Sequence, residues 1–269
     1  MCGIAGYSLV GGSTAPRTMA AQALLAGIAE RGEDAVGYAY RSPGEDDAVI
    51  AVHKRQTGAS GLIDDISVPD TASQVLVHVR DFTKGHPSFD VNNHPIRHGA
   101  VVGIHNGVIA NDEEVLERHG FEREWPGMTV DSEAIFALVE ESANDPRSLE
   151  ELHGTMAAAW LDERDPGTLF LARGIGRPLW IGESREGVFF ASTSAALAVV
   201  ERSLRIGLAH RELSEGTLLR VCGGHVVSER SFQPDHSFRE ERTLPAVRSQ
   251  YEGEYCLQRM AVIAAWTMA

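Results

Sequence analysis

Along most of this chain, apolar residues either alternate with polar ones or run together in short blocks, and both patterns are typical of β-strands. The first block begins at Gly3 and ends at the pair Gly11-Gly12. Turn-forming residues, such as the pair Pro43-Gly44, separate later blocks. The predicted strands are 3–10, 35–40, 48–53, 74–79, 155–161, 169–173, 179–181, 188–192, 217–222 and 225–229.

Fewer segments have apolar residues spaced three or four positions apart, which is the pattern that predicts amphipathic helices. Asp131 precedes one of them and is expected to act as its N-cap, because a short polar side chain can accept from the first free backbone amides. The predicted helices are 19–29, 112–118, 132–142, 194–203 and 252–269.

Two segments in the middle of the chain are distinctive. Residues 83–99 hold two prolines and two asparagines and predict a long irregular loop, of a kind often associated with function. In residues 100–110, two apolar runs flank the dipeptide Asn106-Gly107. Asn and Gly tolerate the positive φ of a tight turn, so this segment predicts a β-hairpin.

Many strands, few helices and no strict alternation of the two predict a layered α+β fold rather than a doubly wound sheet. We expect one domain over residues 1–245 and a C-terminal helical tail over residues 246–269. The apolar residues of this tail fit two alternatives, which are packing on its own domain and docking to a synthase or a second copy.

Composition narrows the possible partners. Lys and Arg number 24 and Asp and Glu 38 among 269 residues, so the formal net charge is −14. Such a balance disfavours binding to nucleic acid or anionic membranes. No apolar run approaches the ~20 residues of a membrane span, and no secretory signal is visible. Three cysteines outside any CxxC pair and histidines outside any HExxH motif predict no disulfide framework and no zinc site, so we expect a cytoplasmic protein.

Cys2 is the residue most suggestive of chemistry. If Met1 is removed, the thiol and the free α-amine belong to one residue, and an α-amine with a pKa of about 7.7–8.0 can act as a base near neutral pH. A nucleophile activated by its own N-terminal amine needs no histidine partner. The alternative is a buried cysteine that only begins a strand.

Six short motifs together favour the chemical interpretation, because they resemble class II glutamine amidotransferases, a family with an N-terminal cysteine nucleophile. They follow the order and closely the spacing of that family over about 130 residues, and a weaker resemblance extends to about residue 220. The motifs are MCGIAG at 1–6, RGEDAVG at 31–37, HVR at 78–80, NHP at 93–95, HNGVI at 105–109 and VDSE at 130–133.

The resemblance implies a role for each motif residue. Cys2 is the expected nucleophile, and the Asn106 side-chain amide with the Gly107 backbone N–H is the expected oxyanion hole. Arg80 is expected to bind the α-carboxylate of glutamine and Asp131 its α-ammonium group. Without the resemblance, Arg80 reads as a surface charge at the end of a strand and Asp131 as a helix cap.

Thr83 and His94 are expected to shape the same substrate pocket, and Arg31 is expected to be structural, pairing with Asp34 or a helix end. Many family members have Trp-Ala-Thr-His-Gly after the arginine, whereas this chain has DFTKG at 81–85. Asp81 replaces an aromatic residue of the loop that closes over glutamine. A carboxylate there is placed to pair with Arg80 and weaken the carboxylate clamp.

The implied fold is the four-layer αββα sandwich of N-terminal-nucleophile (Ntn) hydrolases. The implied activity is hydrolysis of L-glutamine to glutamate and ammonia through a cysteinyl thioester, without a metal or organic cofactor. We expect the ammonia to serve a separately encoded synthase, and a homo-oligomer is a further expectation. Two alternatives remain, namely an Ntn amidohydrolase acting on a γ-glutamyl or other amide, and a non-catalytic glutamine-binding regulatory subunit.

Overall fold

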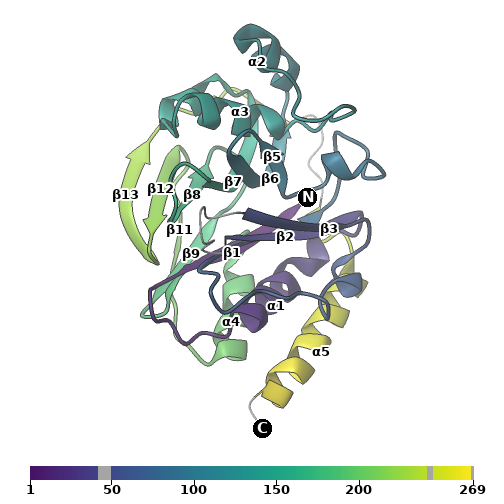
Figure 1. Ribbon diagram of the computed structural model, residues 1–269. Helices are drawn as coiled ribbons and strands as arrows, with labels where there is room; N and C mark the ends of the chain where they lie inside the picture. The colour runs from purple at the N-terminus through teal and green to yellow at the C-terminus, as the bar shows by residue number, and fades with distance from the viewer. Residues whose placement is uncertain (42–49, 241–244, 268–269) are drawn as a thin grey trace.

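The computed structural model describes residues 1–41, 50–240 and 245–267, and these residues form two antiparallel β-sheets stacked face to face (Figure 1). The first sheet has the strand order β11-β9-β10-β1-β4-β2-β3 and the second β13-β12-β8-β7-β6-β5. The first consists of β1 (Gly3–Leu9), β2 (Ala35–Arg41), β3 (Ile50–Arg55), β4 (Gln74–Arg80), β9 (Trp180–Ser184), β10 (Gly187–Ala191) and β11 (Ala209–Glu212). The second consists of β5 (Ile96–His98), β6 (Val101–Ile109), β7 (Gly154–Asp162), β8 (Thr168–Arg173), β12 (Thr217–Cys222) and β13 (His225–Ser231).

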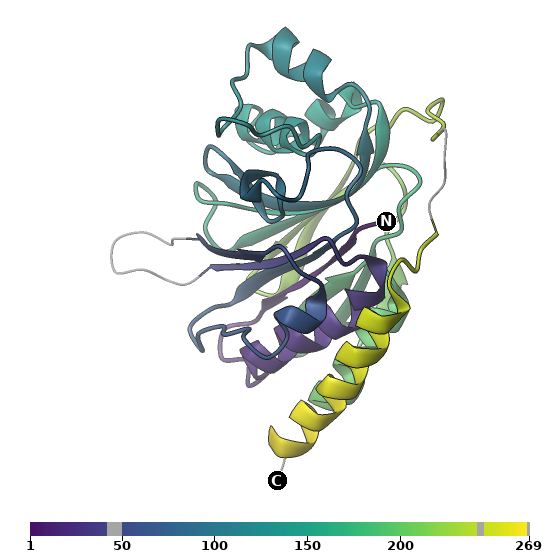
Figure 2. The same ribbon diagram turned by 90° about the vertical axis from the view of Figure 1, so that its right-hand side faces the viewer.

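Helices cover the outer face of each sheet, which gives four layers in the order α, β, β, α (Figure 2). The helices α1 (Arg17–Ile28) and α4 (Ser194–Leu204) lie against the first sheet, and α5 (Gln250–Thr267) packs mainly on α1. The helices α2 (Asp112–His119) and α3 (Glu133–Glu141) lie on the side of the second sheet. The short 3-10 helices are η1 (Ala29–Arg31), η2 (Ala59–Gly61), η3 (Asp90–Asn92) and η4 (Pro146–Glu151). The expected α+β sandwich is confirmed.

The alternation of side chains along each strand builds the hydrophobic layers between these elements. In β1, Ile4 points into the core between the sheets, where Ile104 of the second sheet also lies. Tyr7 of the same strand points the other way, into the core that contains Leu24 of α1. Phe136 of α3 belongs to the third core, on the outer face of the second sheet.

The predicted hairpin at Asn106-Gly107 is wrong. One continuous strand, β6, runs through both residues and pairs with β7 along its whole length, from Val101 opposite Asp162 to Ile109 opposite Gly154. A type I′ turn needs a positive φ at both central residues. Of the two, Gly107 alone has one, at +151°. The apolar residues before and after the dipeptide therefore pair with β7 and not with one another.

The predicted N-cap is also wrong, because α3 begins at Glu133 with Ser132 as its N-cap residue and no capping by a side chain. Most other predicted elements are present with ends shifted by a few residues. Two strands were not predicted, namely β11 and β5, which lies within the segment 83–99 that was expected to be irregular. The turn expected at Pro43-Gly44 and the start of the strand predicted at 48 lie outside the described residues.

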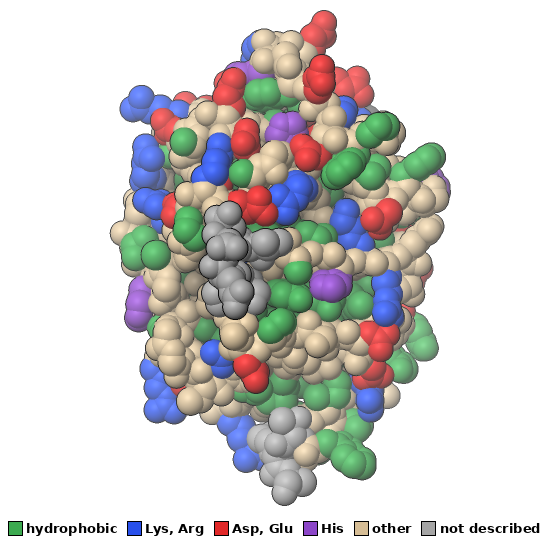
Figure 3. Space-filling view, viewed as in Figure 1, with side chains coloured by type: hydrophobic (Ala, Val, Ile, Leu, Met, Phe, Trp, Pro, Cys, Tyr) green, Lys and Arg blue, Asp and Glu red, His purple; other side chains and the backbone are tan. Residues whose placement is uncertain are grey.

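The C-terminal helix α5 packs against its own domain through one face, where Cys256 and Met260 lie in the same core as α1. The opposite face exposes large apolar side chains, among them Tyr251 and Trp266. Hydrophobic side chains over α5 are visible at the lower right of Figure 3. No helix within residues 1–41, 50–240 and 245–267 combines the length and the apolar character that crossing a membrane requires.

Candidate active site

The pairing of β1 with β4 places Cys2 beside Arg80. Gly3 lies opposite Val79, so the residue before β1 meets the residue that ends β4. The thiol of Cys2 donates to the backbone oxygen of Asp81 at 3.4 Å. The two ends of these neighbouring strands therefore form one edge of the candidate site.

The turn at Arg31-Gly32 packs against this edge. The Nε of Arg31 donates to the backbone oxygen of Cys2 at 2.9 Å. A Cβ at Gly32 would lie 2.3 Å from the backbone oxygen of Arg80, so only glycine fits there. This close approach explains the Arg-Gly motif. The expectation that Arg31 is structural understates its position, because Arg31 contacts the proposed nucleophile and not Asp34.

The second sheet reaches the same place through β6. The Nε2 of His78, on β4, lies 3.1 Å from the backbone oxygen of His105 on β6, so a polar contact joins the two sheets in their buried interface. Asn106 and Gly107 follow His105 directly. The two sheets thus bring residues about a hundred positions apart to one site.

Six of the seven predicted site residues line one small cavity, whose free volume of about 10 Å³ is about enough for a single water molecule. The loop 81–85 forms part of its wall, and the cavity must widen before a molecule of the size of glutamine can enter. Asn106, the seventh, lies immediately before a lining residue. The six are Cys2, Arg80, Thr83, His94, Gly107 and Asp131.

The side chain of Asn106 is fully buried, and neither its oxygen nor its nitrogen has a hydrogen-bond partner among the described residues. An unpaired buried amide costs free energy, so its presence next to a cavity points to a ligand. Gly107 permits the local backbone path, because a Cβ there would lie 1.9 Å from the backbone oxygen of Thr155.

Arg80 is buried and holds the loop that follows it. Its Nη1 donates to Asn93 Oδ1 at 2.5 Å, and its Nη2 donates to the backbone oxygens of Lys84, at 2.8 Å, and Gly85. Asp81 does not pair with Arg80, contrary to the expectation. Its carboxylate instead accepts the N-terminal ammonium group of Met1 and pairs with Arg248 at 3.0 Å.

Asp131 is a buried carboxylate directed at β6. Its Oδ2 accepts the backbone N–H of Ile109 at 2.8 Å, and the hydroxyl of Ser132 donates to its Oδ1 at 3.4 Å. Burial raises the pKa of Asp131 to about 6. The same Ser132 oxygen lies 2.9 Å from Nδ1 of His105, so a chain of polar contacts joins Asp131 to the strand that carries Asn106.

Three buried histidines lie at the site, of which His94 and His105 line the cavity. His94 stacks on His78 with ring centroids 4.3 Å apart, and neither ring nitrogen of His94 has a partner within the described residues. Burial lowers the pKa of His94 and lowers the pKa values of His78 and His105 to about 3. These imidazoles are therefore neutral near pH 7, and His94 can offer both a donor and an acceptor to a ligand.

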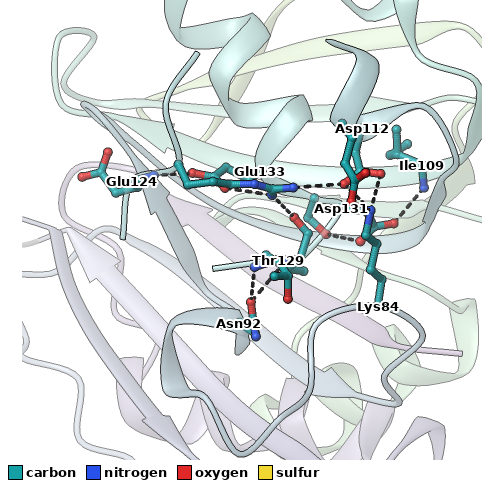
Figure 4. A network of polar contacts seen from close by, with 12 residues as sticks. Lys84, Asn92, Ile109, Asp112, Glu124, Thr129, Asp131 and Glu133 are labelled. Atoms are coloured by element: carbon teal, nitrogen blue, oxygen red, sulfur yellow. Dashed lines mark hydrogen bonds and ion pairs between the residues drawn. The ribbon is translucent and has the colours of Figure 1, made fainter. Parts of the chain in front are cut away.

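A network of charges attaches the loop 81–85 to α2 (Figure 4). The ammonium group of Lys84 lies 2.8 Å from both carboxylate oxygens of Asp112 and 3.0 Å from Glu113. Arg123 joins the buried Asp112 to Glu133 of α3. Lys84 belongs to the segment 81–85 in which the sequence departs from the family, but its pairs with α2 were not expected. The contact of Arg248 with the site was not anticipated at all.

The thiol of Cys2 is partly buried, and this burial raises its pKa. It is therefore protonated near pH 7 and needs a base before it can act as a nucleophile. The cavity brings this thiol together with two cations, Arg80 and Lys84, and two carboxylates, Asp81 and Asp131. The Asn106 amide, without a partner among the described residues, lies next to it. This combination suits acyl transfer from an amide that carries both a carboxylate and an ammonium group.

Comparisons by sequence find a family model and curated relatives that resemble this chain. A sequence model described as "Glutamine amidotransferase domain" matches residues 88–199. The glutamine–fructose-6-phosphate aminotransferase (isomerizing) of Listeria innocua is 30% identical over 272 residues, covering 91% of this chain and 41% of that protein. The corresponding enzyme of Vibrio vulnificus is 32% identical over 166 residues, covering 58% and 26%. The chain thus spans less than half the length of these curated relatives.

Solved structures show the same fold. The glutamine phosphoribosylpyrophosphate amidotransferase of B. subtilis superposes with a TM-score of 0.67 at 17% identity, over 86% of this chain and 49% of that one. A glutamine aminotransferase class-II domain protein from Silicibacter pomeroyi superposes with a TM-score of 0.53 at 17% identity, over 87% of this chain and all of that one. The chain belongs to the class II glutamine amidotransferase family and has its Ntn-type amidotransferase fold.

Proposed function

We propose that this domain is a glutaminase that hydrolyses L-glutamine to L-glutamate and ammonia through a thioester on Cys2. The observation that carries the proposal is the unpaired, buried amide of Asn106, which lies next to a cavity that also holds Cys2, Gly107, Arg80 and Asp131. A donor without a partner is ready for an oxyanion that exists only in the transition state.

The substrate would be held at its two charged ends. Asp131 would accept the α-ammonium group, and the guanidinium of Arg80 would attract the α-carboxylate. Because Arg80 already donates to two loop carbonyls, binding of the carboxylate and the position of the loop 81–85 are coupled. Thr83 and His94 would shape the cavity around the side-chain amide.

In the reaction, removal of Met1 would free the α-amine of Cys2, which takes the proton of the thiol as sulfur attacks the side-chain carbonyl carbon. The oxyanion would rest on Asn106 and on the N–H of Gly107. The amine then returns the proton to the leaving nitrogen, the C–N bond breaks, and ammonia departs. Water attacks the resulting thioester, and glutamate and the free thiol are restored.

The relatives named above are aminotransferases, so we further propose that the ammonia passes to an acceptor enzyme, on a separate chain. A free catalytic thiol remains reduced in the cytoplasm, where we place the reaction. Co-purification of the native protein, followed by a glutaminase assay with and without the captured partner, would identify this acceptor.

The direct test combines intact-mass measurement with a glutaminase assay of the wild type and Cys2→Ala. We expect the purified protein to lack Met1, the wild type to release ammonia, and the variant to release none. A retained Met1 contradicts the mechanism, because its amide blocks the amine of Cys2. Equal turnover of amides without an α-carboxylate would favour a broader amidohydrolase, and glutamine binding without turnover would favour a regulatory domain.

A further inference from the structure

Asp81 links the N-terminus of the chain to the segment that leads into α5. Its carboxylate accepts the N-terminal ammonium group and, at 3.0 Å, the Nε of Arg248. Its backbone oxygen accepts the thiol of Cys2 at 3.4 Å. One residue thus contacts the nucleophile, the terminal amine and a side chain from the C-terminal segment.

Arg248 is held in place by the turn that also holds Cys2. The backbone amides of Arg248 and Ser249 both donate to the backbone oxygen of Glu30, at 2.8 and 3.0 Å. Arg31, which follows Glu30 in the chain, donates to the backbone oxygen of Cys2. Figure 2 shows the chain leading into α5 passing close to the N-terminus.

The first turn of α5 is fixed as well. The carboxylate of Glu252 accepts the N–H of Ser60 at 2.6 Å and its hydroxyl at 2.7 Å. A Cβ at Gly253 would lie 2.8 Å from that of Glu30, so the helix approaches η1 closely. The position of Arg248 is therefore set by the docking of α5 and does not depend on its own side chain alone.

We propose that Asp81 and Arg248 are positioning residues for the α-amine of the processed chain, so that the C-terminal helix contributes to the active site. This inference rests on the proposed function, in which that amine is the base. After loss of Met1 the free amine belongs to Cys2, one residue or about 3.8 Å further along the chain. The thiol of the same residue already contacts the backbone oxygen of Asp81. The Asp81 carboxylate then holds the amine next to the sulfur.

The two charges have opposite effects on this amine. The carboxylate favours the protonated form, which cannot accept a proton from the thiol, and Arg248 offsets that effect by pairing with the carboxylate. The other charged groups facing Cys2 are Arg31 of η1 and Arg80 of β4, with Asp34 and Asp131 next to Arg80. Arg80 is anchored by the loop carbonyls and stays in place when Asp81 or Arg248 is replaced.

The test measures alkylation of Cys2 by iodoacetamide against pH in the processed full-length protein, without glutamine, with kcat and KM measured alongside. Cys222 and Cys256, quantified on their own peptides, report general changes in reactivity. For Arg248→Gln we expect about 10-fold slower alkylation near neutral pH, and the acidic limb of the rate–pH profile should move to higher pH by about one unit. For Asp81→Asn we expect the acidic limb to move to lower pH.

Arg248→Lys should restore the wild-type profile. The matched control is Arg259→Gln, since Arg259 lies on α5, which follows Arg248 in the chain, but pairs with the exposed Asp64 at 2.6 Å, and it should leave the profile unchanged. Equal profiles for folded Arg248→Gln and Arg259→Gln would overturn the inference even if glutamine is hydrolysed. If the variants show shifted profiles but the wild type lacks glutaminase activity, the positioning role is supported and the proposed function is refuted.

Discussion

The backbone N–H of Ile109 donates to the carboxylate of Asp131 at 2.8 Å, although 22 positions separate the two residues. The bond ties the residue proposed to bind the α-ammonium group to the strand that carries the proposed oxyanion hole. In the proposed function, substrate binding and transition-state stabilisation would therefore be linked, so that a change at Asp131 would affect both.

Asp131→Asn should weaken glutamine binding and remove a pH dependence. Burial raises the pKa of Asp131 to about 6, so the carboxylate is charged above that pH and neutral below it. The KM of the wild type should therefore rise as the pH falls through about 6. The variant should show a KM raised by roughly 30-fold or more at pH 7, with no such dependence. Asp70→Asn, an equal charge change at an exposed site, is the control in steady-state assays.

Asn106→Ala should lower kcat by about 10²–10³-fold with little change in KM, because its amide would act only on the transition state. The same change should leave the melting temperature unchanged or higher, since the wild-type amide is buried without a partner in the described structure. Activity within three-fold of the wild type, by ammonia release, would exclude Asn106 from the oxyanion hole.

Lys84→Met should open the loop 81–85. The Lys84 side chain is about one-third exposed, so its pairs with Asp112 and Glu113 are weakened by salt. We expect alkylation of wild-type Cys2 to accelerate by up to about five-fold at high salt, and the variant to be fast at all salt concentrations. Glu113→Gln removes only the exposed partner and should behave like the wild type. A wild-type rate independent of salt would show that these pairs do not hold the loop.

Acid should destabilise the fold through its buried histidines. The pKa values of His78 and His105 are about 3 in the folded chain, against about 6.5 unfolded. Their contribution to stability is complete above pH 6.5 and falls with pH, by about 1.4 kcal/mol per pH unit for each. Asp131 has the opposite effect, because its pKa is raised in the folded chain. Between about pH 6 and 4 it stabilises the fold by about 1.4 kcal/mol for each unit that the pH falls.

We therefore expect the free energy of unfolding, from denaturant titrations at several pH values, to fall by at least about 1.4 kcal/mol per pH unit from pH 6 to 4. His105→Gln should flatten this dependence, whereas His225→Gln, at an exposed position, should not. A stability that stays constant over this range would contradict neutral buried imidazoles.

Local patterns were enough to predict most of the strands, since residues such as Ile4 and Tyr7 of β1 alternate between two cores. The strand β11 was missed because Ala209–Glu212 lies at the edge of a sheet with polar, partly exposed side chains. The apparent hairpin at Asn106-Gly107 failed for a related reason. Local turn propensity was outweighed by pairing with β7, which lies some fifty positions away.

The motif residues of the site were found from the resemblance, but their partners were not. Asp131 looked like a helix cap because the next turn is helical, yet its carboxylate points to β6. The pair Asp81–Arg248 joins residues that no local rule connects. Such contacts follow from how the sheets and α5 stack, which the spacing of residues along the chain does not encode.

The contact of His78 with the backbone of His105 limits how the two sheets can move. Hydrocarbon surfaces can slide over one another at little cost, whereas a hydrogen bond holds only in one register. A slip of one residue, about 3.3 Å, would move the Cys2 thiol away from the Asn106 amide that is proposed to stabilise the oxyanion of the substrate. The ring of His78 thus keeps the two sheets in one alignment. Loss of its hydrogen bond should lower the proposed activity while the fold itself is retained.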